Sequence, residues 1–423
     1  MVQYLANLCL GSSVFRKHNV LAECFSVCRE ATDDGRKARE FQAGEGEVMR
    51  VLQCLRPRLC RPKVLVSAVV AAALLYGALL MNGMQPNAKK PRWMEVNSCS
   101  PRANIAFLKT HKCASSAVQN ILFRYGDKHD LNFALPDRDS YLGIVGFTFN
   151  AGMMLSSPLN KLTPNIFAIH TKWDHAEVKK VMPQDTVFFT IVREPKAVFE
   201  SLYIYGQFQT STGLTIDQYV TQMAVNGTRI AGYLGYNQMT WDFGIPREDL
   251  NNLTAVRELV READDHFGLV MVSDRMEESL VLLAQYLCWE LSDVLVLSFN
   301  SLSKEYKTGV SAETRQTLQQ KLAPDYLLYR HFLARLDQQV EAFGRDRMAA
   351  EVARLREMMA LLVNTCNFVS KKATQLSGTQ RPWSSKVDGY EGDGGEGCKV
   401  YTHPELSYIN LLRNRQYKRI AKK

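Results

Sequence analysis

The segment Asn104–Tyr125 constrains the fold of this chain more than any other, because a strand, a polar loop and a helix follow one another within it. The apolar run at 104–108 predicts a buried strand. Apolar residues at helical spacing over 115–125 predict a helix with one apolar face, and Ser115 or Ser116 is expected to cap its start. A lysine-rich loop that leads from a strand into a helix presents backbone amides, the positive helix end and full charges to an anion. The segment therefore predicts a cradle for a phosphate-type group.

This cradle differs from the phosphate loop of common ATPases and GTPases. The pattern GxxxxGK[ST] is absent, and no glycine lies between Lys109 and Tyr125. The net charge of +9 fits an acidic ligand, an anionic membrane surface or nucleic acid. Nucleic acid is the weakest of the three, because the chain has no zinc-finger spacing, RNA-binding aromatic motif or long basic helix.

From residue 102 to about residue 336, short apolar runs alternate with helical patterns. The alternation predicts an α/β fold in which helices flank a central parallel sheet of strands buried on both faces. The expected strands are 104–108, 165–169, 186–192, 268–272 and 294–299, and the expected helices are 115–125, 196–205, 254–265, 276–287 and 313–322. Beyond them, the pattern predicts one long amphipathic helix over 336–362, a glycine-rich acidic loop over 384–397 and a solvated basic end from Arg413.

Three separate strands of this predicted sheet are each followed by a basic side chain, namely Lys109, His170 and Arg193. Ligands of open parallel sheets bind outside the carboxyl ends of the strands, so the three are expected at one edge. Arg193 at a strand-to-helix junction can grip a phosphate through two parallel hydrogen bonds, and Ser201 on the same helix can add another. A structural salt bridge of Arg193 with Glu194 or Glu200 is an equally good interpretation.

Two histidines are candidates for a general base, because an imidazole titrates near neutral pH. His170 is the first, and His111 inside the anion loop is the second, although His111 could instead donate to the anion. Four polar and aromatic side chains are candidates for lining an acceptor pocket: Thr171, Lys172, Trp173 and Trp241. The two tryptophans could instead be ordinary core residues.

An uncharged apolar stretch, residues 64–81, is just long enough to span a membrane as a helix. Four basic residues precede it between residues 56 and 63, which places the N-terminus in the cytosol and the C-terminal bulk in the lumen. The expected organisation is a mostly disordered cytosolic region over 1–63, the membrane anchor, a stem over 82–101, a lumenal domain over 102–410 and a basic tail over 411–423.

Five cysteines follow the predicted anchor: Cys99, Cys113, Cys288, Cys366 and Cys398. If Cys113 stays a free thiol in the anion loop, the other four can form two lumenal disulfides in three alternative pairings. Asn226 and Asn252 stand in glycosylation sequons that a lumenal domain could use.

The chain resembles the Golgi galactose-3-O-sulfotransferases. The segment 107–129, FLKTHKCASSAVQNILFRYGDKH, resembles the family's 5′-phosphosulfate loop, and 190–203, TIVREPKAVFESLY, resembles its 3′-phosphate segment. Similarity continues through 181–186, 239–244, 278–295, 329–356 and, more weakly, 403–409, and it looks most like the galactosylceramide (cerebroside) branch. Four positions depart from the family pattern: Cys113 stands for threonine, Glu194 for aspartate, and Ala168-Ile169 for Cys-Asn before the histidine.

The resemblance implies a P-loop-like sulfotransferase fold and the donor 3′-phosphoadenosine 5′-phosphosulfate. Residues carried over for the 5′-phosphosulfate are Lys109, Thr110, Lys112, Ser115 and Ser116, with His111 in the same loop, and those for the 3′-phosphate are Arg193 and Ser201. In the implied reaction, a galactose 3-hydroxyl attacks sulfur in line, His170 accepts its proton, and Lys109 stabilises the leaving phosphate, with no metal required.

The implied acceptor is a terminal galactose on galactosylceramide or lactosylceramide, or alternatively on glycoprotein N- or O-glycans. The resemblance implies a single-pass Golgi membrane protein and leaves a homodimer open. Two other classes compete with this reading. One is a membrane-tethered nucleotide kinase, which would need Mg²⁺ and a carboxylate at a strand end that the sequence does not supply. The other is a membrane-anchored glycan-binding protein with impaired catalysis.

Overall fold

The computed structural model describes residues 99–155, 157–227, 229–297, 310–382, 384–393 and 395–422. The predicted cytosolic region, the membrane anchor at 64–81 and most of the stem lie outside these residues. Within them, no helix has the length and apolar character that crossing a membrane requires.

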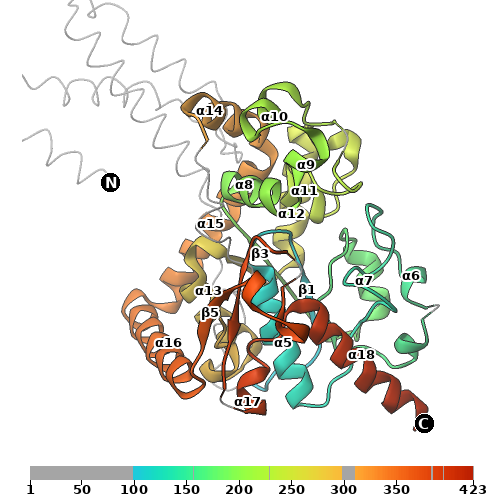
Figure 1. The fold of residues 1–423 in the computed structure, drawn as a ribbon, viewed down its shortest axis with the longest axis vertical. Coiled ribbons are helices and arrows are strands. Elements are labelled where there is room, and N and C mark those ends of the chain that lie inside the picture. The colour runs from blue at the N-terminus through green and yellow to red at the C-terminus, as the bar shows by residue number, and fades with distance from the viewer. Residues whose placement is uncertain are drawn as a thin grey trace, which may run out of the picture. The chain divides into compact units, whose positions relative to one another are not determined.

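A central sheet of four parallel strands confirms the predicted α/β class (Figure 1). The strands are β1 (Ile105–Leu108), β2 (Ile166–Phe167), β3 (Val187–Val192) and β4 (Leu269–Val272), in the spatial order β2-β1-β3-β4. All side chains of β1 and β4 are buried, as continuous apolar runs require when helices cover both faces of a sheet. Because the strands are parallel, their carboxyl ends meet at one edge.

Helices flank this sheet, and five of the predicted ones are found within about two or three residues of their expected ends. They are α5 (Ser115–Lys128), α8 (Pro195–Tyr205), α12 (Leu253–His266), α13 (Met276–Leu287) and α14 (Ala312–Lys321). The shorter helices are α6 (Gly152–Leu155), α7 (His175–Val181), α9 (Phe208–Thr212), α10 (Ile216–Gln222) and α11 (Gln238–Asp242).

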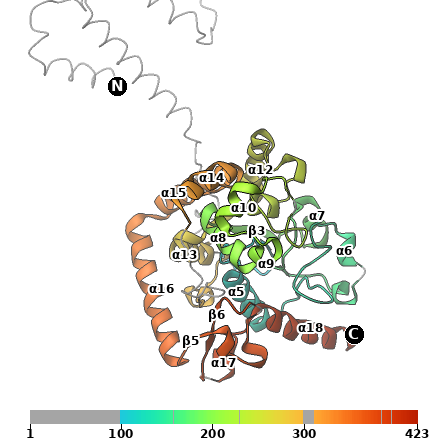
Figure 2. The same ribbon diagram turned by 45° about the horizontal axis from the view of Figure 1, so that its top comes forward.

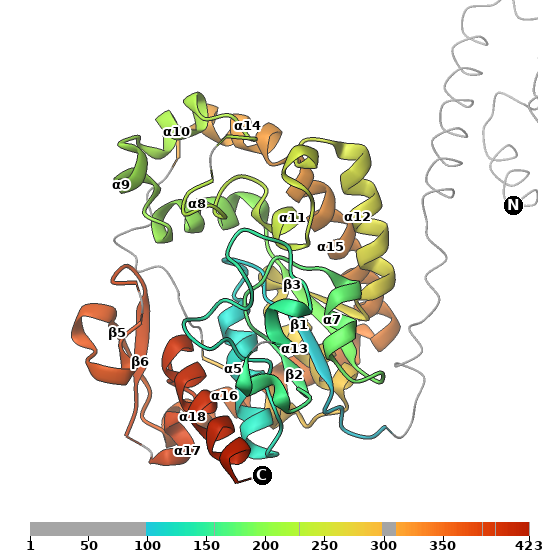
Figure 3. The same ribbon diagram turned by 90° about the vertical axis from the view of Figure 1, so that its right-hand side faces the viewer.

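A second, smaller core lies apart from the sheet. Helices α8, α9, α10 and α14 gather beyond the carboxyl edge of the strands (Figure 3). Their aromatic side chains pack together, with the rings of Phe199 and Tyr236 stacked at 4.8 Å. This core fixes α8, which begins directly after Arg193.

The prediction of a fifth strand at 294–299 is wrong for its described part. Residues Leu291–Val294 form a 3-10 helix, and 295–297 belong to no strand. The apolar side chains there are buried, but the backbone carbonyls of Asp293 and Leu295 accept hydrogen bonds from the guanidinium of Arg124. The Arg124 side chain thus satisfies backbone carbonyls that, in a strand, would form hydrogen bonds with a neighbouring strand.

The single helix predicted over 336–362 is two helices, α15 (Ala323–Phe343) and α16 (Arg345–Thr365). Gly344 separates them with a φ of 99°, a left-handed conformation that glycine adopts without steric cost. After this break α16 runs along one side of the domain, next to α13 (Figure 2).

The predicted loop at 384–397 contains two short regular elements. Strand β6 (Asp388–Glu391) pairs antiparallel with β5 (Val369–Lys372), and α17 (Glu396–Lys399) follows. Pairing with β5 supplies the backbone hydrogen bonds that composition alone does not reveal. Two disulfides, Cys99–Cys288 and Cys366–Cys398, leave Cys113 free and buried, so the predicted use of the five cysteines is confirmed and one pairing is chosen.

The basic end is a docked helix, in contrast to the predicted solvated tail. Helix α18 (Glu405–Ala421) packs along α5 and buries Tyr408, Ile409 and Leu412. Its arginines face outward, where Arg419 donates to the carbonyls of Asp130 and Leu131. The apolar residues at helical spacing were present in the sequence, but the surrounding charges concealed them.

Candidate active site

The loop between β1 and α5 lies at the carboxyl edge of the sheet, as predicted. Lys112 and Ala114 adopt left-handed conformations with φ of 59° and 62°. The predicted serine cap is wrong: Ala114 is the N-cap without a side-chain hydrogen bond, and Ser115 Oγ donates to the Thr110 carbonyl. Thr110 Oγ1 in turn donates to the Ile191 carbonyl of β3 at 2.6 Å. The loop is therefore braced from within, and no side chain caps the start of α5, where a helix favours an anion.

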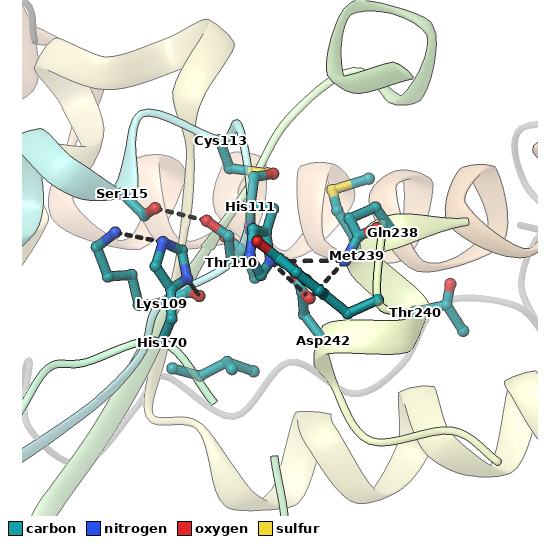
Figure 4. Close-up of polar contacts among 12 residues, drawn as sticks. Lys109, Thr110, His111, Cys113, Ser115, His170, Gln238, Met239, Thr240 and Asp242 are labelled. Carbon is teal, nitrogen blue, oxygen red and sulfur yellow. Dashed lines mark hydrogen bonds and ion pairs between the residues drawn. The ribbon is translucent and has the colours of Figure 1, made fainter. Parts of the chain in front are cut away.

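Lys109 directly follows β1 and points its fully buried side chain at His170 (Figure 4). Its Nζ lies 2.6 Å from His170 Nε2 and 3.0 Å from Glu405 Oε2. His170 Nδ1 lies 3.0 Å from the Lys109 carbonyl, which can only accept, so Nδ1 carries the proton and Nε2 accepts from the lysine. Burial, with the charge of Lys109 second, holds the pKa of His170 well below its usual value. His170 is therefore uncharged near neutral pH.

His111 forms a dyad with Asp242, which reaches the loop from α11. The carboxylate of Asp242 lies 2.9 Å from His111 Nδ1, and it also accepts from the His111 amide at 2.6 Å and from Gln238 Nε2 at 2.9 Å. An ionised carboxylate accepts only, so it fixes the proton on His111 Nδ1 and leaves Nε2 as an acceptor. The two imidazoles stack, with ring centroids 4.2 Å apart (Figure 4).

Arg193 lies beside the same loop. Its Nη1 donates to the Lys112 carbonyl at 2.9 Å, and no ion pair of Arg193 with Glu194 or Glu200 occurs among the described residues. Glu194 instead caps α8 by accepting from the Ala197 amide at 2.8 Å, the usual role of an aspartate at a helix start.

Lys112 contributes a second cation to the loop, and its ammonium lies over the ring of Tyr205 at 3.6 Å. Burial, followed by the charges of Arg193 and Lys109, lowers the pKa of Lys112 to about 7. A dianion entering the loop would offset that repulsion. Ser201, partly buried on α8, makes no hydrogen bond with these side chains in the described part of the chain.

The proposed lining of an acceptor pocket is mostly core. Thr171, Lys172 and Trp173 are at most 5% exposed, and Trp173 belongs to the main apolar core. Trp241 is also buried, with Lys172 Nζ at 3.9 Å and the Arg229 guanidinium at 4.3 Å from its ring. A sugar therefore cannot stack on Trp241 in this arrangement.

Two carboxylates of the site were missed from the sequence. Asp242 lies in the segment 239–244 and Glu405 in 403–409, both of which carry the family resemblance. Neither has a local signature, because each acts on a loop that is 131 or 296 residues away in sequence. The one signal in the sequence for these two carboxylates was that both segments resemble the corresponding segments of the family.

Comparisons with known proteins agree with the resemblance. The sequence model of the family "Galactose-3-O-sulfotransferase" matches residues 48–416. The human galactosylceramide sulfotransferase is 34% identical over 338 residues, which cover 74% of this chain and 79% of that protein. The human galactose-3-O-sulfotransferases 3 and 2 are each 32% identical, covering 76% and 75% of this chain and 82% and 84% of those proteins.

Proposed function

The chain belongs to the galactose-3-O-sulfotransferase family, and on that basis we propose that it transfers sulfate from 3′-phosphoadenosine 5′-phosphosulfate to the 3-hydroxyl of a terminal galactose. The observation that carries the proposal is the anion loop itself. The buried ammonium of Lys109 directly follows strand β1, and the start of α5 after it is capped by no side chain. The imidazole of His170, which lies 2.6 Å from Lys109 Nζ, and that of His111, which lies against the Asp242 carboxylate, stand in the same region.

The donor would be gripped at both ends. Lys109, Lys112 and the start of α5 with Thr110, Ser115 and Ser116 would face the 5′-phosphosulfate, because amides and ammonium groups compensate its charge. Arg193, and Ser201 farther along α8, would face the 3′-phosphate. Arg193 donates to the Lys112 carbonyl, so the side chain proposed for the 3′-phosphate lies next to the loop proposed for the 5′-phosphosulfate. This closeness supports the proposal that the two groups hold one nucleotide.

Sulfuryl transfer forms a bond from the galactose oxygen to sulfur and breaks the bond from sulfur to the 5′-phosphate oxygen. The hydroxyl proton passes to an imidazole, and adenosine 3′,5′-bisphosphate leaves. Lys109 would stabilise the charge that develops on the departing phosphate. The protein supplies position and charge here, as it does in phosphoryl transfer.

The geometry supports His111 over His170 as the base, although the sequence favoured His170. Asp242 orients His111 and would stabilise its imidazolium, whereas Lys109 stands against His170 and would oppose a positive charge there. His170 then serves as a neutral acceptor that aligns the Lys109 ammonium. Both histidines stay within the catalytic group, with exchanged roles.

The acceptor we propose is a galactose on a glycolipid, galactosylceramide or lactosylceramide, with sulfatide as product. The setting would be the lumenal face of the Golgi membrane, with the chain anchored by residues 64–81 and its N-terminus in the cytosol. Galactose on glycoprotein glycans is the alternative acceptor, since the similar human galactose-3-O-sulfotransferase 3 has a name that specifies galactose and no lipid. Glycan binding without turnover is the alternative of another class.

A direct assay tests the function. The full chain, reconstituted in phosphatidylcholine vesicles, is incubated with ³⁵S-labelled donor and with galactosylceramide, lactosylceramide or N-acetyllactosamine. We expect label on the galactose 3-hydroxyl, located by methylation analysis, and the reaction should persist in EDTA. Retention of the acceptors without transfer of label would indicate a binding protein and overturn the proposal.

A further inference from the structure

An exposed apolar loop lies next to the candidate active site. Ile144, Val145 and Phe147 are 58%, 42% and 64% exposed, and they are three of the eight large hydrophobic residues exposed in the described part of the chain. The other five are distributed over four elements, α12, α16, β5 and α18: Leu253, Leu361, Val369, Leu406 and Tyr417. The whole segment 141–151, YLGIVGFTFNA, carries no charge. We call Ile144, Val145 and Phe147 the apolar lip.

The backbone of this loop is fixed at both ends to the strand segment that bears His170. The Leu142 amide donates to the His170 carbonyl and the Phe149 amide to the Lys172 carbonyl, each at 2.8 Å. Between them, the Phe147 amide closes a turn on the Ile144 carbonyl at 3.0 Å. A loop held in this way presents its apolar side chains to solvent as part of its folded form.

Aromatic contacts connect the segment that carries the lip to the candidate active site. Tyr141, directly before the loop, lies 6.0 Å from the ring of Tyr233, and Tyr233 lies 5.5 Å from the ring of His111. A chain of aromatic contacts therefore runs from Tyr141, three residues before the lip, to the imidazole proposed as the base. Exposed apolar clusters of this kind mark contact surfaces.

We propose that the apolar lip enters the surface of the lipid bilayer that carries the acceptor, so that the enzyme takes galactose attached to a membrane lipid. This inference rests on the proposed function and narrows its acceptor. Aliphatic and aromatic side chains on a segment without charged residues suit acyl chains, whereas a glycan on a protein would meet polar groups. The uncharged stretch 64–81 ends twenty residues before the domain, and such a stem spans at most ~70 Å, which keeps the lip within reach of its own membrane.

The test compares one enzyme on two forms of the same sugar. The full chain with Ile144→Ser and Phe147→Ser is assayed on galactosylceramide in phosphatidylcholine vesicles and on water-soluble methyl β-galactoside. We expect kcat/KM on the vesicles to fall by ~10-fold or more and that on the soluble galactoside to stay within about twofold. Leu361→Ser is the matched control, because Leu361 is 68% exposed on α16, away from the site.

An equal loss on both acceptors, or no loss on vesicles, would overturn the role of the lip. A wild-type chain that sulfates neither galactoside would instead contradict the proposed function. Turnover of the soluble galactoside by the variant shows that it is folded.

A second inference rests on a separate contact, that of Glu405 with the anion loop. Glu405 opens α18 and is held there because Tyr408 of the same helix packs against Phe123 of α5, with ring centroids 5.4 Å apart. Its Oε2 lies 3.0 Å from Lys109 Nζ and accepts from Ser116 Oγ at 3.4 Å. Its Oε1 is buried and has no hydrogen-bond partner among the described residues.

We infer that Glu405 is a positioning residue, which keeps the Lys109 ammonium protonated and aimed at the donor. The other groups that face Lys109 do not replace it: His170 is neutral, any charge on Lys112 repels that of Lys109, and Asp242 is engaged by His111. Burial lowers the pKa of Lys109, and the Glu405 carboxylate opposes that shift. The inference depends on the proposed function through the donor.

Glu405→Gln tests this role through the pH dependence of kcat/KM for the donor, which reports on the free enzyme. Without the carboxylate, Lys109 loses its proton at a lower pH. Activity should therefore decline earlier as pH rises, by ~10-fold or more at the alkaline end and little near pH 6. Glu396→Gln, on the exposed helix α17, is the matched control. A uniform loss at every pH would reduce Glu405 to a structural role, and an unchanged profile would exclude it from the site.

Discussion

Replacement of His111 by alanine should lower kcat by ~10²- to 10⁴-fold, the usual contribution of a general base. The imidazole removed is the one whose Nδ1 proton is fixed by Asp242, so that its Nε2 is free to accept the acceptor's proton. Binding of the product adenosine 3′,5′-bisphosphate should change little, because Lys109 and Arg193 remain. The two quantities are measured by initial rates at saturating donor and by isothermal titration calorimetry.

Two further variants distinguish the role of His111 from that of His170. Asp242→Asn should reproduce most of the loss of His111→Ala, since the amide can stabilise the wrong tautomer and cannot balance an imidazolium. His170→Ala should instead raise the KM for the donor, because Lys109 loses the acceptor that aligns it at 2.6 Å. If His170→Ala abolishes turnover while His111→Ala retains it, the base is His170, as the sequence suggested.

The sequence predicted those parts of the fold whose stability comes from local patterns. The four strands of the sheet and helix α13 were found because long apolar runs and helical periodicity do not depend on distant residues. The prediction at 294–299 went wrong because Arg124, far away in sequence, satisfies the backbone there. The sequence shows a glycine at 344, but it does not show that this glycine adopts a left-handed φ and breaks the helix.

The same distinction applies to the site. Lys109, His111 and His170 were predicted because each follows or lies beside a recognisable strand, and the sheet brings strand ends together. Asp242 and Glu405 come from short or C-terminal helices whose docking is decided by packing, as in the burial of Tyr408 and Leu412 on α18. Carboxylates that act through such contacts have no periodic signature, so they appear only in the folded chain.

Replacement of Arg193 by alanine should weaken binding of adenosine 3′,5′-bisphosphate by ~10- to 100-fold, the range for a lost hydrogen-bonded charge pair with phosphate. Arg193→Lys should retain part of the affinity, because a lysine keeps the charge and loses the planar fork. Calorimetric titration measures both, and Arg354→Ala, an exposed arginine on α16, serves as the control.

Arg193 also braces the loop through the Lys112 carbonyl, and this second role predicts a different result. If bracing alone mattered, the variant would lose affinity for adenosine 5′-monophosphate by the same factor as for the bisphosphate, since the 5′ site would be distorted. If Arg193 holds the 3′-phosphate, affinity for the monophosphate should stay near the wild-type value and the preference for the bisphosphate should disappear. The ratio of the two affinities therefore distinguishes a ligand contact from a structural one, and an unchanged ratio would remove Arg193 from the donor site.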